Sequence, residues 1–170
     1  MSKMNVSRYA RIFQALCVAL IPVILLSSPF IWFFGDKFTD ATYGLNLANF
    51  SLLQRAYMVF LEAISNSLVV YGLVLLIRIA RNFQKNEIFT TATVALFLKL
   101  RRIAGVWALY TMGYAVFFFS IFTTTIPVYF LITSLASVAI VYFFIFVFLS
   151  ILAMLIVKAT ELQGDQDLTV

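Results

Sequence analysis

The chain has 170 residues, of which 64% are hydrophobic and 11% charged, with a mean hydropathy of +1.03 and a net charge of +5. Soluble domains carry about 25% charged residues, so this composition excludes an ordinary globular domain and indicates an integral membrane protein. The sequence contains no histidine, and its single cysteine, Cys17, cannot form an intramolecular disulfide.

Four apolar stretches are long enough to cross a membrane, because a hydrocarbon core of about 30 Å needs roughly 20 apolar residues in a helix. They lie at about 12–34, 58–77, 103–122 and 131–157. The first stretch is too long for a signal peptide and has no small-residue cleavage site, so we expect an uncleaved helix. The sequence thus predicts a single all-α domain over 1–170, an antiparallel bundle of four transmembrane helices.

Glu62 is the only acidic residue within a predicted span. Asn66 follows one helical turn later, and an intramembrane carboxylate marks a candidate functional site. The alternative is that Glu62 lies near the outer interface, reaches water or Arg55, and only orients the helix. A transporter would need partners for this acid from other spans, and the sequence suggests none.

Basic residues predict the orientation of the chain. Six lie between the second and third spans, namely Arg78, Arg81, Lys85, Lys99, Arg101 and Arg102. Three precede the first span, whereas the 35–57 segment has two, offset by two aspartates. Because basic loops stay in the cytoplasm, both termini and the central loop are predicted to be cytoplasmic.

The central loop should contain a basic continuation of the second span and then a new helix capped by Thr90 or Thr91. We expect that helix to lie along the lipid headgroups, with its apolar face toward the bilayer. The six cations then either enforce topology and bind anionic headgroups, or form a docking surface for an acidic partner or for the protein's own tail.

The tail at 158–170 is short and acidic, with Glu161, Asp165 and Asp167 before the apolar tip at Val170. It is either a disordered solubilising end or a short amphipathic extension of the fourth span, broken at Gly164. An apolar carboxyl terminus can also add to the sheet edge of a partner. The candidate partner-binding residues are Arg81, Lys85, Arg101, Arg102, Asp165, Asp167 and Val170.

The chain resembles domain-of-unknown-function family 2975, small multi-pass proteins of the bacterial inner membrane. The matching motifs are Arg81-Asn82-Phe83, Ile88-Phe89, Leu100-Arg101-Arg102-Ile103-Ala104-Gly105, Glu161-Leu162 and the end Asp165-Gln166-Asp167-Leu168-Thr169-Val170. One departure is Asn86-Glu87, where the family pattern has a glycine. The resemblance implies a membrane partner for a small helix-turn-helix transcription regulator.

These observations favour a non-catalytic protein with no cofactor, no metal site and no direct contact with nucleic acid, because no catalytic base, nucleophile elbow or phosphate-binding loop is visible. The leading hypothesis is a membrane tether or sensor whose basic loop and acidic tail bind a cytoplasmic regulator. One alternative is a small transporter or channel, a homodimer or larger, with Glu62 and Asn66 in a polar path. Another is an immunity or stress protein that acts laterally on another membrane protein.

Overall fold

The computed structural model describes the backbone of residues 3–34, 50–85, 87, 90–122 and 128–167. It also describes their side chains, except those of 3–6, 118–122, 128–139, 142 and 163–167. All regular structure in these ranges is helical, in four elements: α1 (Lys3–Phe34), α2 (Leu52–Gln84), α3 (Thr91–Phe122) and α4 (Val128–Asp167). The predicted all-α class is therefore confirmed.

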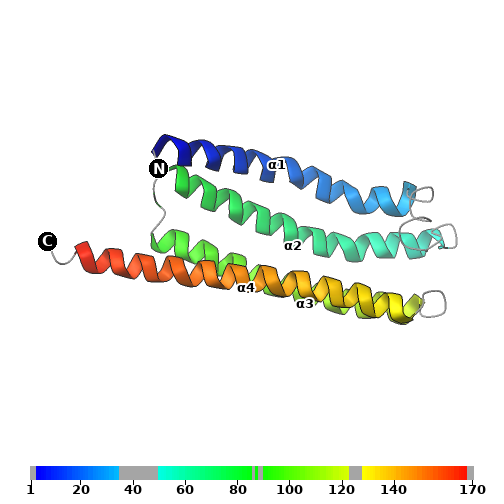
Figure 1. The fold of residues 1–170 in the computed structure, drawn as a ribbon. Helices are drawn as coiled ribbons and strands as arrows, with labels where there is room; N and C mark the ends of the chain where they lie inside the picture. The colour runs from blue at the N-terminus through cyan, green and yellow to red at the C-terminus, as the bar shows by residue number, and fades with distance from the viewer. Residues whose placement is uncertain (1–2, 35–49, 86, 88–89, 123–127, 168–170) are drawn as a thin grey trace.

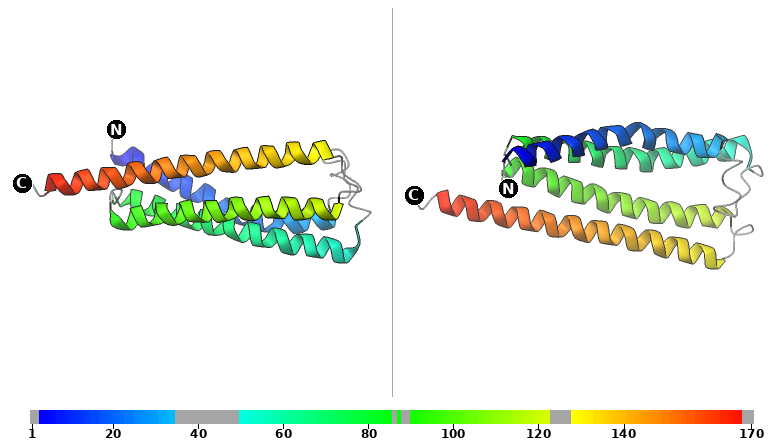
Figure 2. Two further views of the ribbon diagram at one scale, coloured as in Figure 1. Left: turned by 90° about the horizontal axis from the view of Figure 1, so that it is seen from below. Right: turned by 45° about the horizontal axis from the view of Figure 1, so that its top comes forward.

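The four helices run alternately up and down and pack mainly in chain order, α1 on α2, α2 on α3 and α3 on α4 (Figure 1). Both termini and the α2–α3 connection lie at one end of the bundle, which we call the connection end (Figures 1 and 2). At this end α4 extends beyond the other three helices in every view.

Each helix is longer than a bilayer requires. The helices have 32, 33, 32 and 40 residues, which at about 1.5 Å per residue exceed a hydrocarbon core of about 30 Å. Three helical segments are long and apolar enough to cross a membrane, at Ser7–Phe34, Leu52–Gln84 and Phe143–Leu162. The predicted span at 103–122, inside α3, stays a prediction.

The α2–α3 connection is held by side-chain hydrogen bonds. Thr93 is fully buried, and its hydroxyl accepts from Asn82 Nδ2 at 3.0 Å and donates to the Glu87 carbonyl at 2.7 Å. Thr90 Oγ1 accepts from the Thr93 amide at 3.3 Å and so caps α3. The predicted cap at Thr90 is confirmed, and the turn positions α3 directly against α2.

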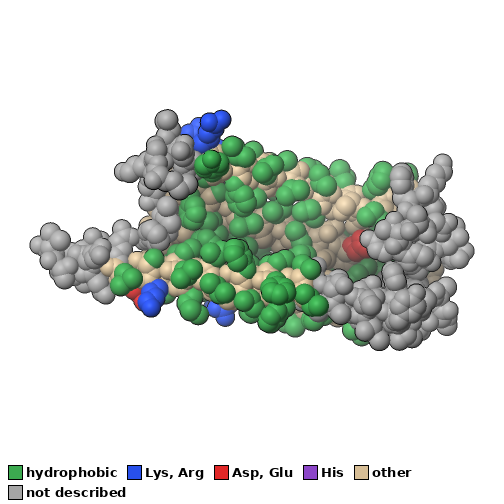
Figure 3. Space-filling model, in the orientation of Figure 1, with side chains coloured by type: hydrophobic (Ala, Val, Ile, Leu, Met, Phe, Trp, Pro, Cys, Tyr) green, Lys and Arg blue, Asp and Glu red, His purple; other side chains and the backbone are tan. Residues whose placement is uncertain are grey.

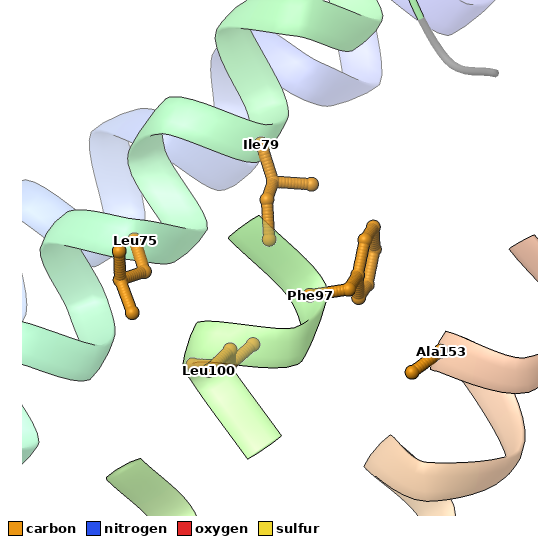
Figure 4. Packing of buried hydrophobic residues seen from close by; sticks show 5 residues of the cluster. All are labelled: Leu75, Ile79, Phe97, Leu100 and Ala153. Carbon is orange, nitrogen blue, oxygen red and sulfur yellow. The ribbon is translucent and has the colours of Figure 1, made fainter. Parts of the chain in front are cut away.

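The predicted separate helix along the headgroups is wrong, because Thr91–Phe122 forms one continuous helix. The apolar residues of its first part pack on protein instead of lipid. Phe97 and Leu100 of α3 form a cluster with Leu75 and Ile79 of α2 and with Ala153 of α4 (Figure 4). We call these five residues the connection-end core.

The outer surface of the bundle is apolar, as expected for a protein solvated by lipid. In α1 the buried residues are Ala10, Cys17, Ser28 and Trp32, whereas large apolar side chains such as Leu26 and Phe34 are exposed. Figure 3 shows hydrophobic side chains over the middle of one face and Lys and Arg side chains toward the connection end. Small and polar residues facing a neighbouring helix are typical of packing inside a membrane.

The tail is helical further than the sequence suggests, because α4 runs through Gly164 to Asp167. A disordered end over 158–167 and a break at Gly164 are therefore wrong. A single helical glycine costs only about 1 kcal/mol, which a helix of this length tolerates. Val170 lies outside the described residues.

Thr93→Val keeps the volume of this buried side chain but removes the hydroxyl that bonds Asn82 and Glu87. We expect the free energy of unfolding to fall by about 1–3 kcal/mol, the usual cost of leaving buried polar groups unpaired. Thermal unfolding in detergent micelles, followed by tryptophan fluorescence, measures the change. Thr91→Val is the matched control at an exposed position, and an equal loss in both variants would contradict this role of Thr93.

Candidate functional site

Glu62 lies inside the apolar part of α2. It follows Arg55 by seven residues and precedes Arg78 by sixteen, which corresponds to about 10 Å and about 24 Å along the helix. If these two arginines bracket the hydrocarbon region, Glu62 lies about a third of the way across it, closer to the end opposite the connection end.

Three donors from two other helices converge on the Glu62 carboxylate. From α1, Ser28 Oγ bonds to Oε2 and Trp32 Nε1 donates to Oε1 at 2.8 Å. From α3, the Tyr114 hydroxyl bonds to Oε1 at 3.2 Å. Ser28 and Trp32 are buried, at 3% and 6% exposure. We call these four residues the Glu62 site.

The hydrogen-bond partners of Glu62 limit which forms of its carboxyl group, ionised or protonated, fit the site. The indole of Trp32 can only donate, so Oε1 of Glu62 must accept. The Ser28 hydroxyl can donate a hydrogen bond to an ionised Oε2 or accept one from a protonated Oε2. The hydrogen-bond pattern is therefore compatible with both the carboxylate and the carboxylic acid, a property expected of a structural acid and of a proton-binding acid alike.

Further polar contacts surround the Glu62 site. Asn66 Nδ2 donates to the Ile24 carbonyl of α1 at 3.1 Å. Tyr110 of α3 donates to the Leu61 carbonyl of α2 at 2.6 Å. One turn away, Trp107 Nε1 of α3 donates to Ser65 Oγ of α2 at 2.9 Å. These bonds link α1, α2 and α3. Among the described hydrogen bonds, Asn66 bonds to α1 and not to Glu62.

Aromatic rings and Arg55 enclose the Glu62 site on the side that faces the end of the bundle opposite the connection end, which we call the far end. The rings of Trp32 and Phe50 meet edge to face, with centroids 5.9 Å apart. Arg55 donates from Nε to the Phe50 carbonyl and from Nη1 to the Trp32 carbonyl, at 3.2 and 3.3 Å. Arg55 therefore holds the backbone of the residue whose indole binds Glu62.

The expectation that no other span supplies a partner for Glu62 is wrong. Ser28, Trp32 and Tyr114 were not identified from sequence, since each is a common residue type in a membrane helix. The spacing of polar residues along each helix is a sequence signal that points to these partners. Ser28 and Trp32 are four residues apart, as are Tyr110 and Tyr114, so each pair presents its polar groups on one helix face.

The predicted partner-binding residues lie at two depths. Arg81 and Lys85 are exposed at the C-terminal end of α2, which we call the tip, and Arg81 is adjacent to Asn82. Arg102, also exposed, follows Thr93 by nine residues, so it lies about 14 Å deeper in the bundle. Arg101 lies beside it, with its guanidinium carbon 5.7 Å from the centre of the Phe146 ring of α4.

The helical path of α4 separates the acidic tail from the deeper arginines. Glu161 follows Phe146 by fifteen residues, so it lies about 22 Å further along the helix axis, toward the tip. Asp165 and Asp167 continue α4 in the same direction, although their side chains are outside the described set. The tail therefore lies nearer to the level of Arg81 and Lys85 than to that of Arg101.

Among the described residues, no group of three or more His, Cys, Asp or Glu side chains could hold a metal ion. Cys17 is buried in α1. Among the described residues, the Glu62 site therefore consists of one carboxyl group and its hydrogen-bond donors.

Glu62→Leu should destabilise the bundle, because Ser28, Trp32 and Tyr114 would lose their common acceptor. We expect the free energy of unfolding to fall by about 1–3 kcal/mol, while Glu62→Gln, which keeps an acceptor oxygen, should cost less. The emission spectrum of Trp32 and unfolding in detergent measure both effects, with Phe60→Leu on the exposed face of α2 as control. Equal stability of the Leu and Gln variants would contradict the proposed bonding.

Comparison with known proteins gives one match. The model of the family described as protein of unknown function (DUF2975) matches residues 55–170, which contain Glu62 and Tyr114 but not Ser28 and Trp32. No curated protein and no solved structure matches the chain. Since the match covers more than half of the chain, the protein belongs to the DUF2975 family.

Proposed function

We propose that the protein is a non-catalytic, multi-pass protein of the bacterial inner membrane that binds a cytoplasmic protein at its connection end. In this proposal all four helices span the bilayer, and both termini and the α2–α3 connection are cytoplasmic. The positive residues at this end agree with that orientation, because basic loops are retained in the cytoplasm.

The observation that carries the proposal is the helical extension of α4. One helix runs from an apolar, membrane-compatible segment to Asp167 and extends beyond the other helices (Figure 2). Ala153, buried in the connection-end core, anchors this helix fourteen residues before its end. In this proposal the helical part of the acidic tail, up to Asp167, projects from the membrane as a continuation of α4, which suits a docking element.

The tip of α2 supplies the complementary charge. Arg81 and Lys85 are exposed, and Asn82 and Thr93 fix the turn that follows them. A partner that contacts both the tail and this turn would meet negative and positive groups in a fixed arrangement, and such charge patterns select partners and increase association rates. The family resemblance favours a small helix-turn-helix transcription regulator as the partner.

Removing the tail should release the partner and leave the bundle intact. We expect a chain ending at Thr160 to lose at least about tenfold in copurified cytoplasmic partner after crosslinking in native membranes, because the helix that carries Asp165 and Asp167 is absent. Asp165→Asn/Asp167→Asn tests the charge alone, and should give a partial loss. Mass spectrometry of the crosslinked material identifies and quantifies the partner.

Phe60→Leu, on the exposed face of α2, is the control for this experiment, since it alters a position remote from the connection end and keeps the tail. Its partner recovery should match the wild type. Equal recovery by the full chain and the truncated chain would contradict docking through the tail, provided that both unfold at the same temperature in detergent.

A second candidate function is supported by the convergence of three helices on Glu62. An acid that lies among two hydroxyl groups and an indole N–H from neighbouring helices suits proton or cation transport, with an oligomer enclosing the path. In this case Glu62→Gln should abolish flux in proteoliposomes loaded with a pH-sensitive dye, because the side chain no longer exchanges a proton. Wild-type flux no greater than that of empty liposomes would exclude it.

A further inference from the structure

The outward face of α3 changes abruptly from cationic to apolar. One stripe of exposed residues recurs every three or four positions and runs, from the connection end inward, through Lys99, Arg102, Val106, Leu109, Gly113 and Val116. Leu98, Arg101, Met112 and Phe117, which lie beside this stripe, are also exposed. Leu109 is 73% exposed and Val116 is 61% exposed. Between Arg102 and Val106, which are about one helical turn apart, the stripe changes from cationic to apolar side chains.

The outward face of α2 changes at nearly the same depth. Tyr71 is its last exposed aromatic residue, and Arg78 is the next exposed residue toward the connection end. Leu75 of α2 and Leu100 of α3 pack together in the connection-end core, so the two changes lie beside the same contact. Two neighbouring helices therefore indicate one level for the lipid headgroups.

Arg101 adds a third cation at this level. Its guanidinium carbon lies 5.7 Å from the centre of the Phe146 ring. The same ring packs over Gly105, one turn deeper in α3, where a Cβ would meet it in ordinary van der Waals contact at 3.6 Å. The ring fixes Arg101 at the α3–α4 contact without neutralising its charge. Within the described part of the chain, no carboxylate forms an ion pair with Lys99, Arg101 or Arg102.

We infer that Lys99, Arg101 and Arg102 bind the headgroup of an anionic phospholipid whose acyl chains lie along Val106 and Leu109 of α3. Arginine forms bidentate hydrogen bonds with phosphate oxygens. Basic clusters on the cytoplasmic side of membrane helices attract anionic headgroups, and an apolar helix face accepts acyl chains. This inference rests on the proposed membrane placement of α3.

The acidic tail cannot occupy this site while α4 is helical. Glu161 follows Phe146 by fifteen residues and so lies about 22 Å beyond it along the helix axis. Five of the six cations between the second and third predicted spans therefore divide by position. Lys99, Arg101 and Arg102 are available to lipid, and Arg81 and Lys85 at the tip are available to a protein partner.

The test compares two variants that each remove two positive charges from exposed side chains. Lys99→Gln/Arg102→Gln changes the lipid site, and Arg81→Gln/Lys85→Gln changes the tip. Each full-length protein is placed in micelles with equal amounts of phosphatidylglycerol and phosphatidylcholine, and retained lipid is counted by native mass spectrometry. We expect the first variant to retain phosphatidylglycerol roughly 25-fold less tightly than the wild type, at about fivefold for each of the two cations, and the tip variant to match the wild type.

Three outcomes would overturn the inference: equal loss in both variants, no loss in either, or equal retention of the two lipids by the wild type. Soluble glycerol phosphate should not displace the lipid, and if it does, the site recognises a free phosphate instead. Lys99→Arg/Arg102→Lys, which preserves both charges, should restore binding. Flotation of every variant with vesicles tests membrane insertion separately, so a failure of the membrane proposal is distinguishable from a failure of the lipid site.

Discussion

The structure depends on the fact that lipid solvates apolar side chains as well as a protein interior does. Burying leucine between two membrane helices therefore stabilises their contact far less than it would in water, and close packing and hydrogen bonds must hold the helices together. This explains why α1 turns Ser28 and Cys17 inward and leaves Leu26 and Phe34 exposed. The Glu62 site is the strongest expression of this constraint, because one carboxyl group receives donors from α1 and α3.

The connection end combines the hydrogen bonds of Thr93 with a larger apolar core. Its core is built from Leu75, Ile79, Phe97 and Leu100, which are at most 8% exposed. Apolar packing of this kind is favoured where water competes for the surface. This core agrees with the proposed placement of α2 and α3, in which both helices leave the hydrocarbon region near Arg78 and Arg102. Among its described side chains, α4 contributes Ala153 to this core and Phe146 to the contact with Gly105, and none of its described residues bonds to Glu62.

The approximate positions of the four helices could be predicted from the sequence, because runs of apolar residues are a direct consequence of the bilayer thickness. The additional helix expected along the headgroups was wrong. Thr90 could be predicted as a cap, and Glu62 was conspicuous because an isolated acid in an apolar run is costly. Its partners could not be predicted, since Ser28 and Tyr114 are 34 and 52 residues away in sequence and resemble many other polar residues of the spans.

Two other features depended on tertiary contacts. The amphipathic segment that begins α3 has the pattern of a helix lying on a membrane surface. This pattern alone does not show whether its apolar face contacts lipid or the side of α2. The structure resolves this through Thr93, whose hydroxyl bonds set the turn that directs α3 back along α2. Gly164 suggested a break because of its propensity alone, whereas α4 continues through it to Asp167.

The arrangement also suggests how a change at Glu62 would reach the connection end. Glu62 and Arg81 lie on one uninterrupted helix, and α1 runs beside it from the Glu62 site to Gln14, whose Oε1 accepts from Gln84 Nε2 at 3.1 Å. A ligand or proton that weakened the bonds from Ser28 and Trp32 would loosen α1 at one end while Gln14 still held it at the other. The resulting motion of α1 against α2 is a pivot at the connection end, beside the turn proposed to bind the cytoplasmic partner. A sensor of this design needs no catalytic group, because a shift in helix packing is the whole signal.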